Sequence, residues 1–257
     1  MKKRNVLIVA NWKMNPQTLS KAEKLFSDIQ KTASRLQNVQ TVICPPIAFL
    51  GELLHLYSGQ KILFGVQDVF WQDEGSYTGY IGSAMIKNMG AEYVILGHSE
   101  RRKLGEDNET INKKVLSALT EKLKIVLCVG EKERDVHGEY LTFLREELQS
   151  AFENVPIQML KNIVIAYEPI WTIGREADDA MDPQEVHEMV IFIRKTLAEI
   201  YDANTAQRVP VLYGGSVEPS NASVLLERGE INGFLIGHAS LVPQDFNEIL
   251  SIASKRN

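Results

Sequence analysis

Eight short apolar runs, rich in β-branched residues, recur along the chain at a spacing of roughly thirty residues, the size of one strand–helix unit. They are Val6–Ala10, Thr41–Cys44, Ile62–Val66, Tyr93–Leu96, Ile125–Val129, Ile163–Ala166, Val209–Tyr213 and Phe234–Ile236. Amphipathic helical patterns lie between them, for example Lys21–Leu36, Thr110–Leu123, Tyr140–Phe152 and Glu185–Tyr201. Because each right-handed crossover returns the chain in the same direction, this alternation predicts parallel strands. Eight uninterrupted units predict an α/β fold, an eight-stranded parallel (β/α)8 barrel.

The chain gives no sign of a domain boundary. No linker rich in proline, glycine or serine interrupts the series, so residues 1–257 are expected to form one barrel domain. An open doubly wound sheet is the alternative. The glycine-rich fingerprint expected after the first strand of such a sheet is absent, which favours the barrel.

Charge and cysteine content limit the partners and the compartment. The formal net charge is −5, so no overall positive field attracts nucleic acid or an anionic membrane. Cys44 and Cys128 both lie in apolar runs, which indicates buried free thiols in a reducing compartment. The apolar run after the basic residues 1–4 is too short for a signal peptide, and no segment approaches the length of a membrane span. We expect a cytoplasmic protein.

Polar residues and glycines directly follow most of the predicted strands. They are Asn11 and Lys13, Gln67, His98, Gly130 and Glu131, Glu168, Gly214 and Gly215, and Gly237. The carboxyl ends of barrel strands meet at one face, where barrel enzymes assemble their active sites. Residues far apart in sequence, such as Lys13 and Glu168, are therefore predicted to be neighbours.

Glu168 ends a buried strand in a setting that suits a general base. It follows the apolar run Ile163–Ala166, and Pro169 then prevents the strand ladder from continuing. Trp171 adds apolar bulk, and a carboxylate poised in a partly dry site can remove a proton from carbon. On this segment alone, a solvated strand-end glutamate is the alternative.

Four motifs occur in order from the first predicted strand to the last. They are Asn11-Trp12-Lys13-Met14-Asn15, Gly97-His98-Ser99-Glu100-Arg101-Arg102, Tyr167-Glu168-Pro169-Ile170-Trp171 and Tyr213-Gly214-Gly215-Ser216. Together they resemble the motifs of the triosephosphate isomerase family over essentially the whole chain. The resemblance implies a TIM barrel that interconverts dihydroxyacetone phosphate and glyceraldehyde 3-phosphate through an enediolate. It also implies a role in glycolysis and gluconeogenesis.

The resemblance assigns roles to five residues. Lys13, His98 and Glu168 match the family's catalytic residues, and Asn11 and Glu100 support them. Glu168 would remove the carbon-bound proton, and Lys13 would supply positive charge for the enediolate and the phosphate. His98 precedes a predicted helical turn, where an imidazolium is disfavoured, so a neutral ring would shuttle protons between the two oxygens. This glutamate–histidine pairing is the one known for the family.

The resemblance also implies how the anionic sugar-phosphate substrate is held. Its phosphate would rest on backbone amides at Gly174, in a lid loop, and at Ser216, Gly237 and His238 near the last two strands. This chemistry needs no metal and no cofactor, and the histidines show no zinc-type spacing.

The stretch Gln67–Gly82 is too long for a plain connection. Its aromatic residues are Phe70, Trp71, Tyr77 and Tyr80. A monomer would not readily expose them. In the family this loop inserts into a neighbouring subunit beside the catalytic lysine, with a threonine at its tip, here Thr78. The resemblance therefore implies a homodimer, and a loop folded back on its own barrel is the alternative.

The chain departs from the family pattern in three places. The lid, residues 172–181, lacks the usual glycine and lysine, gains acidic residues and is two residues longer. The paired glycine after the last strand has become Gly237-His238, and the His238 ring occupies space near the phosphate. The tip of the long loop carries Tyr80 where the family usually has a glutamate that could pair with Arg101 across the interface.

These departures leave Lys13, His98 and Glu168 unchanged but alter the lid and the phosphate site. An isomerase of a four-carbon ketose phosphate, such as erythrulose phosphate, is therefore an alternative, because one extra carbon is a modest binding difference. A non-catalytic phosphate-binding paralogue is a second alternative. A Schiff-base mechanism through Lys13 is disfavoured, because no second lysine lies nearby in sequence to activate it.

Overall fold

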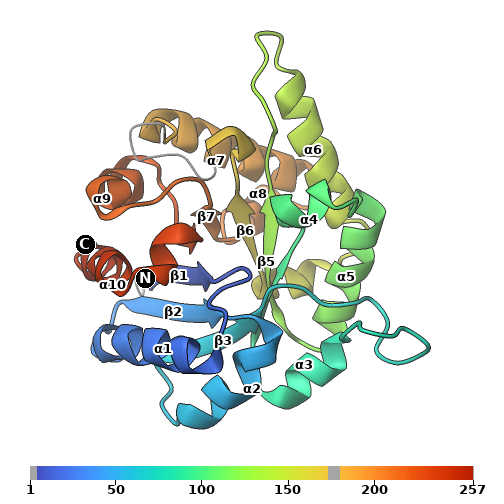
Figure 1. Ribbon diagram of the computed structural model, residues 1–257. Coiled ribbons are helices and arrows are strands. Elements are labelled where there is room, and N and C mark those ends of the chain that lie inside the picture. Colours follow the sequence, from blue (N-terminus) through green and yellow to red (C-terminus); the bar gives the residue numbers. More distant parts are fainter. Residues whose placement is uncertain (1–4, 173–179, 257) are drawn as a thin grey trace.

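The computed structural model describes residues 5–172 and 180–256 of the chain. In this part of the chain, eight parallel strands close into a barrel in the order β1 to β8, and helices pack around its outside (Figure 1). The strands are β1 (Val6–Asn11), β2 (Val39–Cys44), β3 (Ile62–Val66), β4 (Tyr93–Leu96), β5 (Lys124–Val129), β6 (Ile163–Tyr167), β7 (Val211–Tyr213) and β8 (Gly233–Ile236). The predicted α/β barrel is confirmed.

Helices connect the successive strands. They are α1 (Leu19–Ala33), α2 (Ile47–Leu56), α3 (Ser83–Met89), α4 (Ser99–Lys103), α5 (Asn108–Thr120), α6 (Glu139–Ala151), α7 (Pro183–Ile200), α8 (Ala203–Ala206), α9 (Pro219–Arg228) and α10 (Pro243–Ser254). The 3-10 turns are η1 (Ile157–Asn162), η2 (Ile170–Thr172) and η4 (His238–Leu241). None of the described helices combines the length and the apolar character that crossing a membrane requires.

Capping side chains and prolines set where helices begin. The side chain of Thr18 accepts a hydrogen bond from the backbone N–H of Lys21 at 3.3 Å, so α1 begins at Leu19 and not at the predicted Lys21. The helices α7, α9 and α10 each begin with a proline, whose fixed φ suits the first helical position. Strand β7 is shorter than the predicted run Val209–Tyr213, because Pro210 has no N–H to donate to a ladder.

Alternate strand residues face opposite sides of the barrel wall. In β1, Ile8 packs with the surrounding helices, whereas Leu7 and Val9 belong to the cluster that fills the barrel interior. Cys44 and Cys128 belong to the interior cluster, and both are buried free thiols, as predicted. Burial raises the pKa of both thiols, so they stay protonated at neutral pH.

Because all eight strands are parallel, their carboxyl ends share one rim of the barrel. The register between β1 and β2 runs from Val6 opposite Val39 to Asn11 opposite Cys44, which places Asn11 at that rim. Tyr167 at the end of β6 lies opposite Val129 of β5 and Tyr213 of β7. The residues that follow each strand are thereby brought together at one face.

Candidate active site

A cavity of about 560 Å³ opens at the carboxyl ends of the strands. The predicted site residues that line it are Asn11, Lys13, His98, Glu168, Ser216, Gly237 and His238. Glu100 does not line this cavity but contacts Lys13 from one side. Gly174, the remaining predicted residue, lies outside the described part of the chain. The structure therefore brings together residues from β1, β4, β6, β7 and β8.

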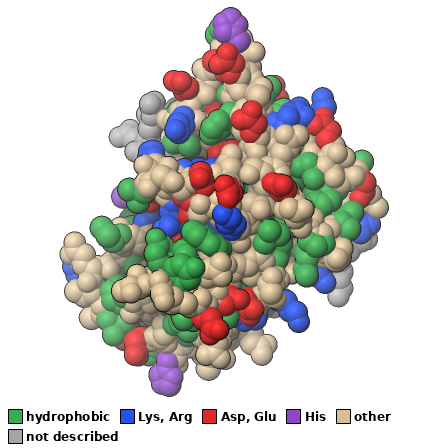
Figure 2. Space-filling model, turned by 90° about the vertical axis from the view of Figure 1, so that its right-hand side faces the viewer, with side chains coloured by type: hydrophobic (Ala, Val, Ile, Leu, Met, Phe, Trp, Pro, Cys, Tyr) green, Lys and Arg blue, Asp and Glu red, His purple; other side chains and the backbone are tan. Residues whose placement is uncertain are grey.

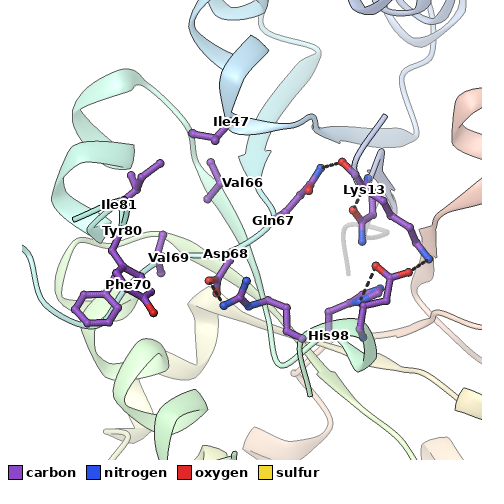
Figure 3. Close-up of a pocket in the computed structure, with 14 residues that line it drawn as sticks. Lys13, Ile47, Val66, Gln67, Asp68, Val69, Phe70, Tyr80, Ile81 and His98 are labelled. Atoms are coloured by element: carbon purple, nitrogen blue, oxygen red, sulfur yellow. Dashed lines mark hydrogen bonds and ion pairs between the residues drawn. The ribbon is translucent and has the colours of Figure 1, made fainter. Parts of the chain in front are cut away.

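Lys13, just after β1, has an unusual backbone conformation that hydrogen bonds to its N–H and C=O groups stabilise. Its φ is 53°, in the left-handed region that non-glycine residues rarely adopt. The backbone N–H of Lys13 donates to Asn11 Oδ1 at 3.0 Å. Gln67 Nε2 donates to the carbonyl oxygen of Lys13 at 2.8 Å (Figure 3) and to that of Cys44 at 2.9 Å. These contacts fix the direction in which the lysine side chain leaves the strand.

The ammonium group of Lys13 is paired with Glu100. Nζ lies 2.8 Å from Glu100 Oε1, a charge-assisted hydrogen bond at the edge of the cavity (Figure 3). Partial burial of Glu100 raises its pKa, but the hydrogen bond and the charge of Lys13 outweigh it, so the pKa of Glu100 is lowered. Glu100 thus stays ionised and holds the ammonium beside the cavity.

His98 caps the short helix α4, and this contact determines which ring nitrogen carries the proton. Nδ1 accepts a hydrogen bond from the backbone N–H of Glu100 at 3.2 Å. A nitrogen that accepts has no proton of its own, so a neutral His98 carries its proton on Nε2. That nitrogen lies 3.3 Å from Glu168 Oε1. A neutral His98 therefore presents the nitrogen that carries its proton to the side on which Glu168 lies.

Glu168 is buried, with its side chain 3% exposed, and is held at three points. Its backbone N–H donates to the carbonyl of Val129 at 2.8 Å. Its Oε2 accepts from the backbone N–H of Ser99 at 3.2 Å, and its Oε1 faces His98. The carboxylate is removed from bulk water and lies against the histidine.

Two glycines make room for Glu168. A Cβ on Gly130 would lie 1.8 Å from the Glu168 carbonyl oxygen, and one on Gly214 would lie 2.9 Å from Glu168 Cγ. Because real Cβ atoms do not approach so closely, both positions require glycine for this packing. Both glycines follow predicted strands in the sequence, but their position alone did not predict this packing role.

An ion pair that the sequence analysis missed lies behind the cavity. Arg102 Nε donates to the carbonyl of Gly97 at 2.8 Å, and Nη1 lies 3.1 Å from Glu147 Oε1. Glu147 Oε2 accepts from the backbone N–H of Gly130 at 2.8 Å. The pair thus holds the residue before His98 and the glycine that packs against Glu168. A glutamate among the apolar residues on the buried face of α6 was the sequence signal that could have revealed it.

Burial dominates the electrostatics of Glu147. It raises the pKa of this carboxyl to about 7, against the opposing charge of Arg102 and the hydrogen bond from Gly130. In the part of the chain that the structure describes, no group of three or more histidine, cysteine or acidic residues is arranged to hold a metal ion.

Comparison with known proteins identifies the family. A family model described as triosephosphate isomerase matches residues 6–253. The triosephosphate isomerase of Caldanaerobacter subterraneus subsp. tengcongensis is 40% identical, over 96% of this chain and 99% of that protein. The chain belongs to the triosephosphate isomerase family. The triosephosphate isomerases of Alkaliphilus oremlandii and Thermoanaerobacter sp. (strain X514) are 37% and 39% identical over the same shares of the two chains.

Membership of the triosephosphate isomerase family makes this chain an isomerase. Side chains form the β4–β6 end of its large cavity, and a glycine turn forms the β7–β8 end. At the β7–β8 end, Gly237 precedes η4, and the Ser240 hydroxyl donates to the Gly237 carbonyl at 2.6 Å. A Cβ on Gly237 would lie 3.0 Å from Lys13 Cε, so the lysine passes directly over this turn. His238 begins η4 and is exposed.

Buried Glu131 holds η2, the short turn that follows Glu168 in this triosephosphate isomerase family member. Glu131 Oε1 accepts from the Tyr167 hydroxyl at 2.7 Å and from Trp171 Nε1 at 3.2 Å. Arg134 Nε lies 3.2 Å from the same oxygen. These contacts anchor η2, immediately before residues 173–179, which the structure does not describe. The predictions for Gly174 and the rest of the lid concern those residues.

A second cavity, of about 370 Å³, lies on the other side of Lys13. It shares Asn11, Lys13 and His98 with the first cavity, and Ile47 and Tyr80 also line it (Figure 3). Its far wall belongs to the loop between β3 and α3, which projects from the barrel (Figure 1). The two cavities meet at the residues that the family resemblance marks as catalytic.

The aromatic residues of the projecting loop divide into a buried and an exposed group. Phe70 is buried, and its ring lies 4.0 Å from Trp71, 4.6 Å from Tyr77 and 4.3 Å from Tyr80, between centroids. Tyr77 and Tyr80 remain exposed on the outside of this cluster. The loop thus packs partly on itself.

Arg101, expected near this loop, already has partners within its own chain. Its Nη2 lies 2.8 Å from Asp68 Oδ2, and its Nε lies 3.2 Å from Glu106 Oε1. The arginine is therefore neutralised locally although Tyr80 supplies no carboxylate.

Proposed function

We propose that this chain, as a single barrel domain, interconverts dihydroxyacetone phosphate and glyceraldehyde 3-phosphate by proton transfer through an enediolate. The observation that carries the proposal is the arrangement of Glu168 and His98, 3.3 Å apart in one cavity that Lys13 also lines. A carboxylate, an imidazole and an ammonium are the groups that moving a proton between adjacent carbons requires. The relatives that the chain matches are named triosephosphate isomerases.

Glu168 is proposed to be the base that removes the carbon-bound proton. Its burial keeps bulk water from the carboxylate, so its oxygens need not shed a hydration shell before they reach a carbon acid. In this structure its two oxygens are engaged by Ser99 N–H and by His98. Substrate binding must replace these contacts with the reacting carbon, so the two contacts compete with the bound substrate for the carboxylate.

His98 is proposed to move protons between the two substrate oxygens. The hydrogen bond from Glu100 N–H to Nδ1 leaves Nε2–H as the donor that faces the cavity. A neutral imidazole can give this proton to one oxygen and regain a proton from the other. The same backbone contact also keeps the ring in a fixed orientation during both transfers.

Lys13 is proposed to stabilise the negative charge that develops on the enediolate. Its ammonium is oriented by Glu100 at 2.8 Å, and its backbone is fixed by Asn11, so both supporting residues act through the lysine. A preoriented charge in a partly dry site needs little reorganisation when the transition state forms. Lys13 also passes over the turn at Gly237 and reaches the phosphate end of the site.

The substrate phosphate is proposed to bind at the β7–β8 end of the cavity. Ser216, Gly237 and His238 line this end, and their backbone N–H groups would donate to the phosphate oxygens. Gly174 is proposed to add a further donor from the lid. The proposed reaction uses no metal and no cofactor.

We further propose that the chain works as a cytoplasmic homodimer in glycolysis and gluconeogenesis. Apolar side chains near the second cavity support the dimer: Met14, next to Lys13, is 90% exposed, and Tyr80 is 58% exposed. Figure 2 looks onto this side of the molecule and shows hydrophobic side chains gathered on its surface. The loop Gln67–Gly82 of a second copy would enter the 370 Å³ cavity beside Lys13. Sedimentation at micromolar concentration tests the dimer, and a single species of 29.0 kDa would contradict it.

The test of function compares two substrates with one purified sample. Isomerisation of dihydroxyacetone phosphate and of erythrulose phosphate is measured, and the two kcat/KM values are compared. We expect a strong preference for the three-carbon substrate. A preference for the four-carbon substrate would replace this proposal with the alternative, and turnover of neither would favour a phosphate-binding paralogue.

A further inference from the structure

His238 is an exposed histidine at the wall of the larger cavity. Within the described residues, no hydrogen bond or ion pair of its imidazole is found. The other basic side chains of the cavity are engaged: Lys13 pairs with Glu100, and His98 contacts Glu100 N–H and Glu168. Among the described basic side chains of this wall, His238 is therefore the one that remains available to a ligand.

The described side chains of the cavity wall carry more negative than positive charge, which disfavours binding of an anion. Three carboxylates, those of Glu168, Glu218 and Asp245, line the same cavity as one ammonium, that of Lys13. A phosphate monoester carries close to two negative charges at neutral pH. One ammonium, already paired with Glu100 at 2.8 Å, does not offset this excess of negative charge.

His98 is poorly suited to supply the missing charge. A second ring proton would have to occupy Nδ1, which accepts the N–H of Glu100 at 3.2 Å. His238 has no such restriction within the described residues, and it begins η4 directly after Gly237, over which the Lys13 side chain passes. The ring of His238 and the ammonium of Lys13 thus belong to the same end of the cavity.

We propose that His238, in its protonated form, binds the dianionic group of the substrate and makes phosphate binding depend on pH. This inference rests on the proposed function and deepens it. A dianion favours the charged ring, so binding and protonation promote each other. The ionisable groups that face the same space are Lys13, His98, Glu168, Glu218 and Asp245. Histidine is the side chain among these types whose charge ordinarily changes between pH 5 and 8.

The test measures binding of sulfate, which keeps two negative charges throughout this pH range. Calorimetric titration with sulfate at pH 6 and pH 8 gives the dissociation constant for the unmodified protein and for His238→Gln. We expect the affinity of the unmodified protein to fall about five- to tenfold between pH 6 and pH 8, the size of one partly exposed ion pair with a dianion. We expect His238→Gln to bind weakly at both pH values. Equal pH dependence in the two proteins would overturn the inference.

Two further variants separate the charge of His238 from a general disturbance. His238→Lys keeps a positive charge at pH 8, so it is expected to bind sulfate at pH 8 as the unmodified protein does at pH 6. His55→Gln makes the same chemical change in the last turn of α2, outside both cavities, and is expected to match the unmodified protein. Failure of His238→Lys to bind more tightly than His238→Gln at pH 8 would contradict a role for charge.

Kinetics distinguish this inference from the proposed function. With dihydroxyacetone phosphate at pH 6, His238→Gln is expected to raise KM about fivefold and to leave kcat within twofold, since the ring meets the phosphate and not the reacting carbons. A loss of kcat with unchanged KM would contradict the proposal. If the unmodified protein turns over no triose phosphate, the proposed function fails, and the sulfate titrations still decide the role of His238.

Discussion

At the β4–β6 end of the cavity, the side chains proposed to carry the chemistry are locked in place. The side chains of His98 and Glu168 are 8% and 3% exposed, and each is held by a backbone N–H of α4. At the β7–β8 end, the structure offers a glycine turn and the exposed ring of His238. The proposed proton-transfer end is therefore rigid and dry, and the proposed phosphate end is open and built mainly from backbone.

The contrast follows from what each end must do. Proton transfer to or from carbon requires one atom at one position, and an error of about 1 Å costs roughly 100-fold in rate. A phosphate has several equivalent oxygens and accepts donors from many directions, so backbone N–H groups and an exposed ring can share its binding. Variation such as His238 is thus expected to alter affinity, whereas variation at Glu168 is expected to alter the rate of chemistry.

The largest expected effect comes from Glu168→Gln. The amide keeps the shape of the side chain but cannot accept a proton from carbon, so kcat is expected to fall by about 10⁴-fold. Steady-state isomerisation of dihydroxyacetone phosphate measures it, and calorimetry should show sulfate bound at least as tightly, since one carboxylate charge of the cavity is removed. Turnover within tenfold of the unmodified enzyme would show that the base lies elsewhere and that the β4–β6 end is not where protons are transferred.

His98→Gln is expected to have the next largest effect. Glutamine can still donate to a substrate oxygen but cannot carry a proton from one oxygen to the other, so kcat should fall by about 10²- to 10³-fold with little change in KM. His187→Gln, on α7 outside both cavities, serves as the matched control. A rise in KM with kcat retained would place His98 at the binding end instead.

The sequence predicted the barrel because strand and helix periodicities depend on local residue order. It also predicted which residues share the rim, since parallel strands end at one face. It did not predict the contact of Ser99 N–H with Glu168, which joins residues 69 positions apart and depends on the packing of α4. Nor did it predict the pairing of Arg102 with Glu147, because a charged residue on a helix does not reveal its partner across the fold.

Gly130→Ala tests whether the rigidity of the proton-transfer end comes from close backbone packing. A Cβ there would lie 1.8 Å from the Glu168 carbonyl oxygen, so β5 and β6 must separate at Glu168. We expect a loss of stability of about 1–3 kcal/mol and a fall in kcat of about 10- to 100-fold. Urea unfolding and steady-state kinetics measure the two effects.

The control for Gly130→Ala is Gly51→Ala in α2, where a Cβ would meet only Met89 Cε at 3.9 Å. Alanine is a better helix former than glycine, so this variant should be as stable as the unmodified protein or more stable. If Gly130→Ala behaved like Gly51→Ala, the close packing would not be what holds Glu168 in place.

Glu147→Gln is expected to have the smallest effect on activity, but it should change how the stability of the protein depends on pH. Burial raises the pKa of Glu147 to about 7 in the folded protein, against an ordinary value of 4.5. The folded state therefore retains a proton that the unfolded chain has released between these pH values, and the protein loses stability as pH rises through this range. The loss from this one group amounts to about 3 kcal/mol. Urea unfolding at pH 5 and pH 8 measures it.

The amide of Glu147→Gln can still accept the N–H of Gly130 but does not titrate, so the stability of the variant should fall less between pH 5 and pH 8. Glu146→Gln, at the exposed neighbouring position of α6, should follow the pH dependence of the unmodified protein. Identical pH dependence in all three proteins would show that Glu147 is ionised throughout as the partner of Arg102. The proton-transfer end would then rest on a permanent ion pair, and its rigidity would not weaken as the pH falls toward 5.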